Sequence, residues 1–246
     1  MFTPAEREEL RDALIERARA DERVAGAALT GSAAAGTEDR WSDVDLFFGL
    51  AVGADQTAVL ADWTAWMRSE AGAVEHMDVR LGGTVYRVFL LASTLQVDLA
   101  FAPAGEFGAI APTFRLLFGE SVERPRSAPP DTAGLIGWAW LYALHARSSV
   151  ERGKAWQAEY MISGLRDHVL ALACVRHGVP ASQGRGMDLL PAEVTRPLAG
   201  ALDASLDEAA LRRAFAAAVR GLLVEVEAVD ADLADRLRGP LAELAG

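Results

Sequence analysis

The chain has 246 residues, of which 51% are apolar, and it carries a formal net charge of -11. This apolar share is enough to build one large or two smaller domain cores, and it excludes a disordered chain. The negative charge argues against a long DNA or RNA partner, because such proteins need basic residues to neutralise phosphates. The acidity has two interpretations, attraction of a cationic small substrate or solubility alone.

Cysteine content and hydropathy indicate the compartment. The single cysteine, Cys174, lies in an apolar helical pattern, so we expect a buried, inert thiol and neither an internal disulfide nor a cysteine-rich zinc site. The N-terminal segment does not show the basic and then apolar pattern of a signal peptide. The longest apolar stretch, Leu135–Leu144, is shorter than the roughly 20 residues that span a bilayer. We therefore expect a cytoplasmic protein without a membrane partner.

The first hundred residues alternate between helical and extended patterns. Thr3 and Pro4 are typical of a helix start, and the apolar spacing that follows predicts an amphipathic helix to about Ala20. A second helix is predicted over Asp55–Glu70. Apolar runs bounded by turn residues predict strands at Val24–Leu29, Val44–Leu50, Val74–Leu81, Thr84–Leu91 and Leu95–Ala102. Gly82-Gly83 is typical of a hairpin turn, so we expect a mixed or antiparallel sheet with helices on one side.

The second half of the chain is predicted to be helical. Three prolines in Glu123–Asp131 indicate a linker. The next segment, Leu135–Arg147, is apolar nearly all round and predicts a buried helix. Trp138, Trp140 and Trp156 could line an acceptor or base pocket, but helical spacing favours core packing for Trp138. Further helices are predicted over 155–177, 211–226 and 233–244. The fold class is therefore α+β, with a mixed-sheet domain over residues 1–124 followed by a helical bundle over residues 131–246.

Two acids at the start of a strand carry the first chemical signal. Asp43 and Asp45 are two residues apart, so both side chains point to one face of the strand at a spacing of about 7 Å. Carboxylates this close repel each other unless a cation lies between them, and oxygen ligands favour Mg²⁺ or Mn²⁺. Gly31 and Ser32 end the preceding strand, where a bare backbone and a hydroxyl can approach a phosphate.

A third acid, Asp98, lies in an otherwise apolar strand, where an isolated charge would be costly. If its strand lies beside that of Asp43 and Asp45, the three carboxylates converge. Such a cluster is typical of a two-metal site for phosphoryl or nucleotidyl transfer. The hypothesis fails if Asp98 lies on the opposite face of the sheet.

The Gly31-Ser32 pair, the Asp43-x-Asp45 pattern and the later Asp98 together resemble the nucleotidyltransferase superfamily that includes DNA polymerase beta. The small size and the helical second half resemble the aminoglycoside and lincosamide nucleotidyltransferases. The resemblance implies that Asp43 and Asp45 bind two Mg²⁺ ions, with Mn²⁺ as a possible substitute, and that Asp98 completes the metal nearer the acceptor hydroxyl. It also implies that Gly31 and Ser32 hold the triphosphate of ATP or another nucleoside triphosphate.

Two residues of the second half have alternative interpretations. Lys154 could reach the β and γ phosphates of the nucleotide, as a basic residue at a helix start does in the antibiotic-modifying relatives, or it could be a solvated helix start. Glu159 could be a general base for the acceptor hydroxyl, or a surface group paired with Ser163 or Arg166. The sequence leaves open whether Glu159 or Asp98 is the base.

The predicted reaction is transfer of a nucleoside monophosphate, AMP from ATP, to a small hydroxyl-bearing acceptor such as an aminoglycoside-like or lincosamide-like antibiotic. The active site is expected in the cleft between the two domains. Rival hypotheses are a protein-modifying nucleotidyltransferase of an antitoxin type, an inactive nucleotide-binding relative, and an RNA-tailing enzyme, which the net charge disfavours. The sequence does not indicate the oligomeric state.

Overall fold

The computed structural model describes residues 1–125 and 130–245, and the chain divides into two compact units, Met1–Ser127 and Ala128–Gly246. The predicted linker, Glu123–Asp131, includes residues 126–129, which lie outside the described residues. Each unit has a hydrophobic core of its own.

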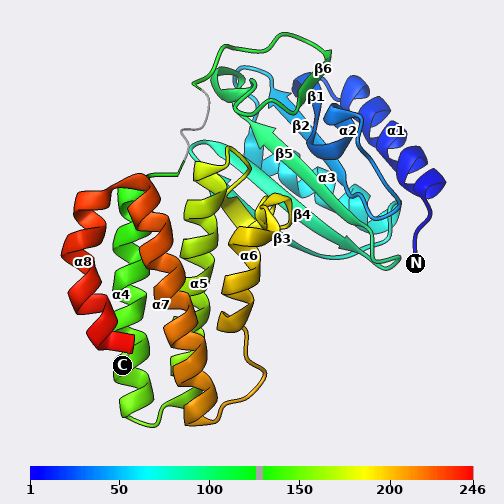
Figure 1. Cartoon of the computed structure of the whole chain (residues 1–246). Helices are drawn as coiled ribbons and strands as arrows, with labels where there is room; N and C mark the ends of the chain where they lie inside the picture. Colours follow the sequence, from blue (N-terminus) through cyan, green and yellow to red (C-terminus); the bar gives the residue numbers. More distant parts are fainter. Residues whose placement is uncertain (126–129, 246) are drawn as a thin grey trace. The chain divides into compact units, whose positions relative to one another are not determined.

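The first unit is built on a six-stranded sheet with the strand order β3-β4-β5-β2-β1-β6 (Figure 1). Its central pair, β2 and β5, is parallel, and all other neighbours are antiparallel. The sheet is therefore mixed, and the α+β class with a helical C-terminal region is confirmed. The strands are β1 (Val24–Thr30), β2 (Val44–Leu50), β3 (Ala73–Leu81), β4 (Thr84–Leu91), β5 (Gln96–Ala102) and β6 (Phe114–Phe118).

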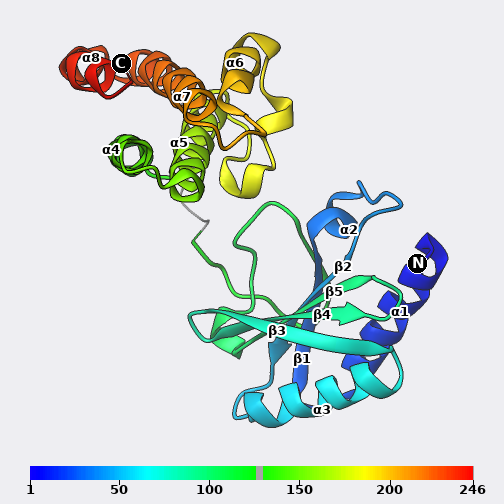
Figure 2. The ribbon, with the colours of Figure 1, turned by 90° about the horizontal axis from the view of Figure 1, so that it is seen from below.

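Two helices, α1 (Pro4–Ala20) and α3 (Gln56–Ser69), pack on one face of this sheet (Figure 2). Leu46 and Phe48 of β2 point into this core, whereas Phe47 belongs to a separate cluster on the other face. Trp63 of α3 is fully buried, and its ring centroid lies 4.9 Å from that of Phe48. Side-chain alternation along β2 thus sends Asp45 and Phe47 to the face that these helices leave open.

The edge strand β6 was missed by the sequence analysis. It pairs antiparallel with β1, with Phe114 opposite Thr30. Its sequence, Phe-Arg-Leu-Leu-Phe, is short and does not alternate, so no periodic signal marks it. The strand exists because β1 offers an unpaired edge for backbone hydrogen bonds.

The second unit is a bundle of long helices with an alanine-rich core. Its helices are α4 (Thr132–Glu151), α5 (Ala155–Arg176), α6 (Ala192–Leu198), α7 (Glu208–Val229) and α8 (Ala231–Ala245). The short helix α6 was not predicted. The described elements of the two units also include the short helix α2 (Gly31–Ala35) and four 3-10 segments: Ala104–Glu106, Ser182–Gly184, Met187–Leu189 and Ala199–Ala201.

The predicted burial of α4 is wrong for its aromatic side chains. Trp138 was expected in the core, but it is 56% exposed, and Trp140 and Leu144 are exposed as well. The buried residues of α4 are mostly small instead, namely Ala139, Ala143, Ala146 and Ser149, with Ile136 and Val150 toward the two ends. Since small side chains let helices approach closely, the neighbouring helices pack on these residues and the indole of Trp138 turns outward.

The expectation of a buried thiol is met. Cys174 is buried, and burial raises the pKa of its thiol, which suits an inert group. Of the helices that the structure describes, none is both long enough and apolar enough to cross a membrane.

The Asp21 carboxylate at the end of α1 generates a testable prediction about acid stability. It accepts hydrogen bonds from the Arg23 guanidinium and, at 3.0 Å, from the Trp63 indole. The Arg23 hydrogen bonds are the main cause that lowers the pKa of Asp21 from 3.8 to about 2. A carboxyl group whose pKa is lower in the folded state than in the unfolded state stabilises the fold fully at pH values above its unfolded-state pKa. This stabilisation is lost as the pH falls through the folded-state pKa.

We therefore expect Asp21→Asn to lower the free energy of unfolding at pH 6, and the difference from wild type to shrink between pH 4 and pH 2. Urea denaturation at a series of pH values measures this difference. A difference that stays constant over the whole range would contradict the prediction.

Candidate active site

The three predicted acids meet on the open face of the sheet. Asp45 of β2 lies directly opposite Asp98 of β5 in the parallel register, and Asp43 precedes β2 by one residue. Each carboxylate offers an oxygen, and these three oxygens all lie within 4.8 Å of one another. All three residues are partly buried. The condition set by the sequence is met, because Asp98 shares the face of Asp43 and Asp45.

The electrostatics of the cluster favour a cation. Burial is the main cause that raises the pKa of Asp98, and the nearby charge of Asp43 adds to it. A hydrogen bond from the Gln96 side-chain amide to Asp98, 3.0 Å long, acts in the opposite direction. The same amide lies 3.4 Å from the Asp43 carboxylate, so Gln96 bridges two of the acids. The sequence analysis missed Gln96, although it shares the strand face of Asp98 through the period of two.

Gly31 and Ser32 lie beside this cluster, where the short helix α2 (Gly31–Ala35) follows β1 directly. Gly31 has a φ of +57°, and a Cβ at this position would overlap the Asp45 carboxylate. Glycine is therefore required both by the backbone conformation and by the close approach. The Ser32 hydroxyl oxygen is buried and has no hydrogen-bond partner among the residues that the structure describes. Such a hydroxyl costs free energy until a ligand oxygen or a water satisfies it.

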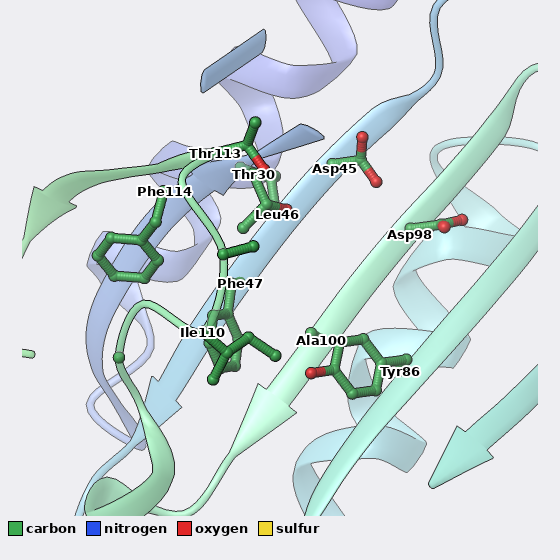
Figure 3. A pocket seen from close by; sticks show the side chains of 12 residues that line it. Thr30, Asp45, Leu46, Phe47, Tyr86, Asp98, Ala100, Ile110, Thr113 and Phe114 are labelled. Atoms are coloured by element: carbon green, nitrogen blue, oxygen red, sulfur yellow. The ribbon is translucent and has the colours of Figure 1, made fainter. Parts of the chain in front are cut away.

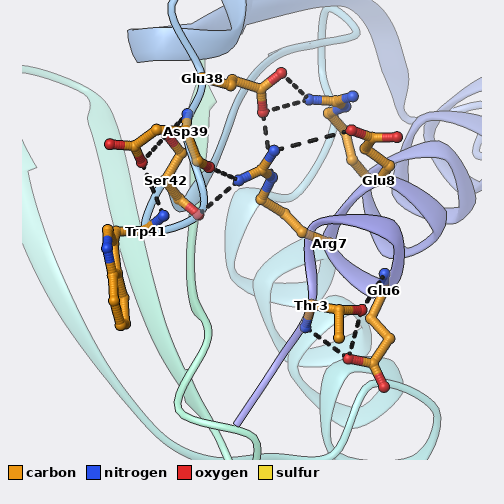
Figure 4. Close-up of polar contacts among 9 residues, drawn as sticks. Thr3, Glu6, Arg7, Glu8, Glu38, Asp39, Trp41 and Ser42 are labelled. Atoms are coloured by element: carbon orange, nitrogen blue, oxygen red, sulfur yellow. Dashed lines mark hydrogen bonds and ion pairs between the residues drawn. The ribbon is translucent and has the colours of Figure 1, made fainter.

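The loop between α2 and β2 is held by α1 (Figure 4). The Arg7 side chain, which is 3% exposed, donates hydrogen bonds to the carbonyl oxygens of Asp39 and Ser42, and its Nε lies 3.3 Å from Glu38. Arg11 donates to the same Glu38 carboxylate at 2.7 Å. Since Ser42 immediately precedes Asp43, these contacts fix the backbone that carries the first acid. The sequence analysis did not single out Arg7.

A pocket of about 200 Å³ opens beside two of the acids, on the same face of the sheet (Figure 3). Asp45 and Asp98 line one end, and the remaining lining is mainly apolar. The lining side chains include Phe47, Tyr86, Ala100, Ile110 and Phe114. All of these residues belong to the first unit.

Lys154 and Glu159 belong to the second unit. Lys154 is exposed and precedes the first residue of α5. Glu159 is partly buried and accepts a hydrogen bond of 2.5 Å from the Ser163 hydroxyl, as one interpretation of the sequence expected. Arg166 pairs instead with Asp167, at 3.0 Å. The predicted roles of Lys154 and Glu159 in the reaction stay predictions.

A family of known domains matches part of the first unit. Residues 7–77 match the nucleotidyltransferase domain family, and this range includes Gly31, Ser32, Asp43 and Asp45 but ends before Asp98. A solved structure, an aminoglycoside 6-adenyltransferase from Bacillus subtilis, is similar over 97% of this chain and 98% of that chain, with 12% sequence identity and a TM-score of 0.41. No curated protein matches the chain.

The chain therefore contains a domain of the nucleotidyltransferase superfamily, and it is a nucleotidyltransferase. The matched range also contains α1 from Arg7 onward and the loop that α1 holds in place.

Replacing Gly31 tests the geometry of this site. We expect Gly31→Ala to destabilise the fold by more than about 1 kcal/mol, because alanine resists a positive φ and its methyl group would overlap Asp45. Transfer activity should fall with it, since the Asp45 side chain must move. Thermal unfolding and pyrophosphate release measure the two effects. Gly36→Ala is the matched control, because Gly36 also has a positive φ but open space around its Cβ position. Equal losses in both variants would contradict the close approach of Gly31 to Asp45.

Proposed function

We propose that the enzyme transfers AMP from ATP to a hydroxyl group of a small acceptor and releases pyrophosphate, in a reaction that depends on Mg²⁺. The observation that carries this proposal is the convergence of Asp43, Asp45 and Asp98 to within 4.8 Å, beside Gly31, in a nucleotidyltransferase domain. This arrangement can hold divalent cations and the reacting phosphate at one place.

The residues present fit such ions. Three carboxylates provide an all-oxygen donor set, which Mg²⁺ and Mn²⁺ prefer. In the proposed complex Asp43 and Asp45 hold two ions, and Asp98 completes the ion on the acceptor side. The ions supply positive charge that offsets the charge developing on the phosphate. Mn²⁺ can substitute because it takes the same ligands.

The triphosphate is proposed to lie over Gly31 and Ser32. Gly31 has no side chain to exclude a phosphate, and the Ser32 hydroxyl has no partner within the described part of the chain. A phosphate oxygen would accept the hydrogen bond that this hydroxyl can donate. This placement puts the leaving pyrophosphate on the β1 side of the three acids.

In the proposed reaction the acceptor oxygen forms a bond to the α-phosphorus while the bond from this phosphorus to the β-phosphate oxygen breaks. The hydroxyl proton passes to a carboxylate, for which Asp98 and Glu159 are the candidates. Asp98 is the candidate that belongs to the acid cluster itself. Pyrophosphate carries away the electron pair of the broken bond.

We further propose that residues 1–124 form the catalytic domain and that the bundle over 131–246 helps to bind the acceptor. The net charge of -11 supports a small acceptor, such as an aminoglycoside-like or lincosamide-like compound, over a nucleic acid. A reaction that uses ATP suits the cytoplasmic location expected from the sequence. Transfer to a partner protein, or nucleotide binding without transfer, are the alternatives that the assays below distinguish.

Charge-neutralising variants test the metal site. We expect Asp43→Asn and Asp45→Asn to lower transfer at least about a thousandfold, equivalent to about 4 kcal/mol of transition-state stabilisation. Both should also weaken Mn²⁺ binding, measured by electron paramagnetic resonance. In the absence of divalent ions their melting temperatures should match or exceed that of the wild type, since each substitution removes like-charge repulsion.

Asp12→Asn is the control for these variants, because Asp12 is an exposed residue of α1. Pyrophosphate release with ATP, Mg²⁺ and a panel of aminoglycosides and lincosamides measures transfer. Activity that survives in Asp45→Asn would contradict the metal site. Transfer to a protein and to none of the small acceptors would favour the protein-modifying alternative.

Lys154→Ala and Glu159→Gln test the proposed contribution of the second unit. If Lys154 contacts the triphosphate, Lys154→Ala raises the dissociation constant of ATP about tenfold and leaves Mn²⁺ binding unchanged. If Glu159 is the base, Glu159→Gln lowers kcat without weakening ATP binding. Ser163→Ala is the matched control for Glu159, since it removes only the observed hydrogen bond partner. If both variants keep the wild-type kcat and the wild-type dissociation constant of ATP, Asp98 is the remaining candidate for the base. The proposed role of the bundle in catalysis would then be wrong.

A further inference from the structure

The pocket beside Asp45 and Asp98 extends from the acids along the strand direction (Figure 3). Phe47 follows Asp45 on β2 by two residues, and Ala100 follows Asp98 on β5 by the same spacing. These side chains therefore share one face, so the floor of the pocket continues the carboxylate cluster. Asp43, Gly31 and Ser32 are not among the residues that line the pocket. The pocket thus leads away from Asp43 toward the later residues of β2 and β5, with Tyr86 on the β4 side and Thr30 and Phe114 on the β1 and β6 side.

The walls of the pocket suit a flat apolar group. The rings of Phe47 and Tyr86 are inclined by only 24°, with centroids 6.4 Å apart, and Phe114 meets Phe47 edge-on at 6.3 Å. Ile110 and Ala111 line another side. Apart from Asp45 and Asp98, no charged side chain of the described residues lines the pocket. The volume of about 200 Å³ is enough for one six-membered ring, since a cavity of about 150 Å³ accommodates benzene.

The position of the pocket relative to the reacting atoms decides which substrate it receives. An in-line displacement requires the attacking oxygen and the leaving pyrophosphate on opposite sides of the α-phosphorus. With pyrophosphate over Gly31 and Ser32, at the end of β1, the attacking oxygen lies on the β5 side, near Asp98. The group that carries this oxygen then lies over Ala100 and Tyr86.

Resting on the function proposed above, we infer that the acceptor is a small alcohol or phenol whose reacting hydroxyl is attached to a flat apolar ring, and that this pocket binds the ring. Ala100 and Tyr86 determine its size and shape. A polycationic sugar would find the two carboxylates of the metal site but no further charged partner in this pocket. Among the small acceptors proposed above, the pocket therefore favours a ring alcohol over an aminoglycoside.

The first experiment compares acceptors. Pyrophosphate release is measured with ATP and Mg²⁺ for benzyl alcohol and 2-phenylethanol, for glycerol as a hydroxyl compound without a ring, and for an aminoglycoside. We expect kcat/KM to be at least tenfold higher for the two ring alcohols than for glycerol and the aminoglycoside. A preference for glycerol or for the aminoglycoside would overturn the inference.

The second experiment fills the pocket. Ala100 is buried and lines the pocket, so Ala100→Leu should raise the KM of benzyl alcohol at least tenfold. The dissociation constant of a non-hydrolysable ATP analogue should stay within twofold of the wild-type value. Ala92→Leu is the matched control, because it adds the same side chain at an exposed turn after β4. Should Ala100→Leu fail to fold by circular dichroism, Ile110→Trp fills the same pocket from a loop and carries the same expectation.

Binding separates this inference from the proposed function. Saturation-transfer NMR detects benzyl alcohol bound to the wild type in the presence of Mg²⁺ and the ATP analogue, and the signal should disappear in Ala100→Leu. An ATP analogue that fails to bind the wild type would overturn the proposed function, while ring binding that persists in Ala100→Leu would overturn the pocket alone. Weaker binding of the analogue with an unchanged KM for benzyl alcohol would assign the pocket to the nucleobase instead.

Discussion

The parallel pairing of β2 with β5 is the constraint on which the site depends. Its register places Asp45 directly beside Asp98, with Asp43 on the same face, and so brings three negative charges within 4.8 Å. Such a cluster costs free energy in the folded chain, and burial adds to the cost by raising the pKa of Asp98. Bound cations would offset this cost, as proposed above for this nucleotidyltransferase domain. The pairing of the strands in the sheet therefore holds the three carboxylates close together.

The surrounding elements keep this charged face in order. The helices α1 and α3 cover the opposite face and bury the alternate residues of β2 and β5, so the register cannot slip without exposing Leu46 and Phe48. Arg7 of α1 holds the loop that ends at Ser42, and Gly31 provides the space that the Asp45 carboxylate occupies. The acids are thus positioned from both sides, by packing below the sheet and by hydrogen bonds at the start of β2.

Beside the charges lies an apolar pocket, and this contrast is informative about the substrate. In the proposed function the three carboxylates hold the ions that bind phosphate and the reacting hydroxyl, which many compounds share. The rings of Phe47, Tyr86 and Phe114 line the pocket, and we propose that they bind the group that carries the hydroxyl. Family membership defines the transfer of a nucleotidyl group, whereas the specificity of this enzyme is proposed to reside in the pocket next to Asp98.

Local patterns in the sequence determined the long helices, five of the six strands and the shared face of Asp43 and Asp45, because periodicity and turn residues act over a few positions. The motif of Gly31, Ser32 and the two acids was also recognisable in the sequence. Only the tertiary structure decided that Asp98 pairs with Asp45, that β6 joins β1, that Arg7 holds the loop and that Trp138 faces outward. These features depend on contacts between segments far apart in the chain, and on which face of a helix finds neighbours. No local pattern encodes such contacts, because the backbone hydrogen bonds of a strand can pair with any free edge.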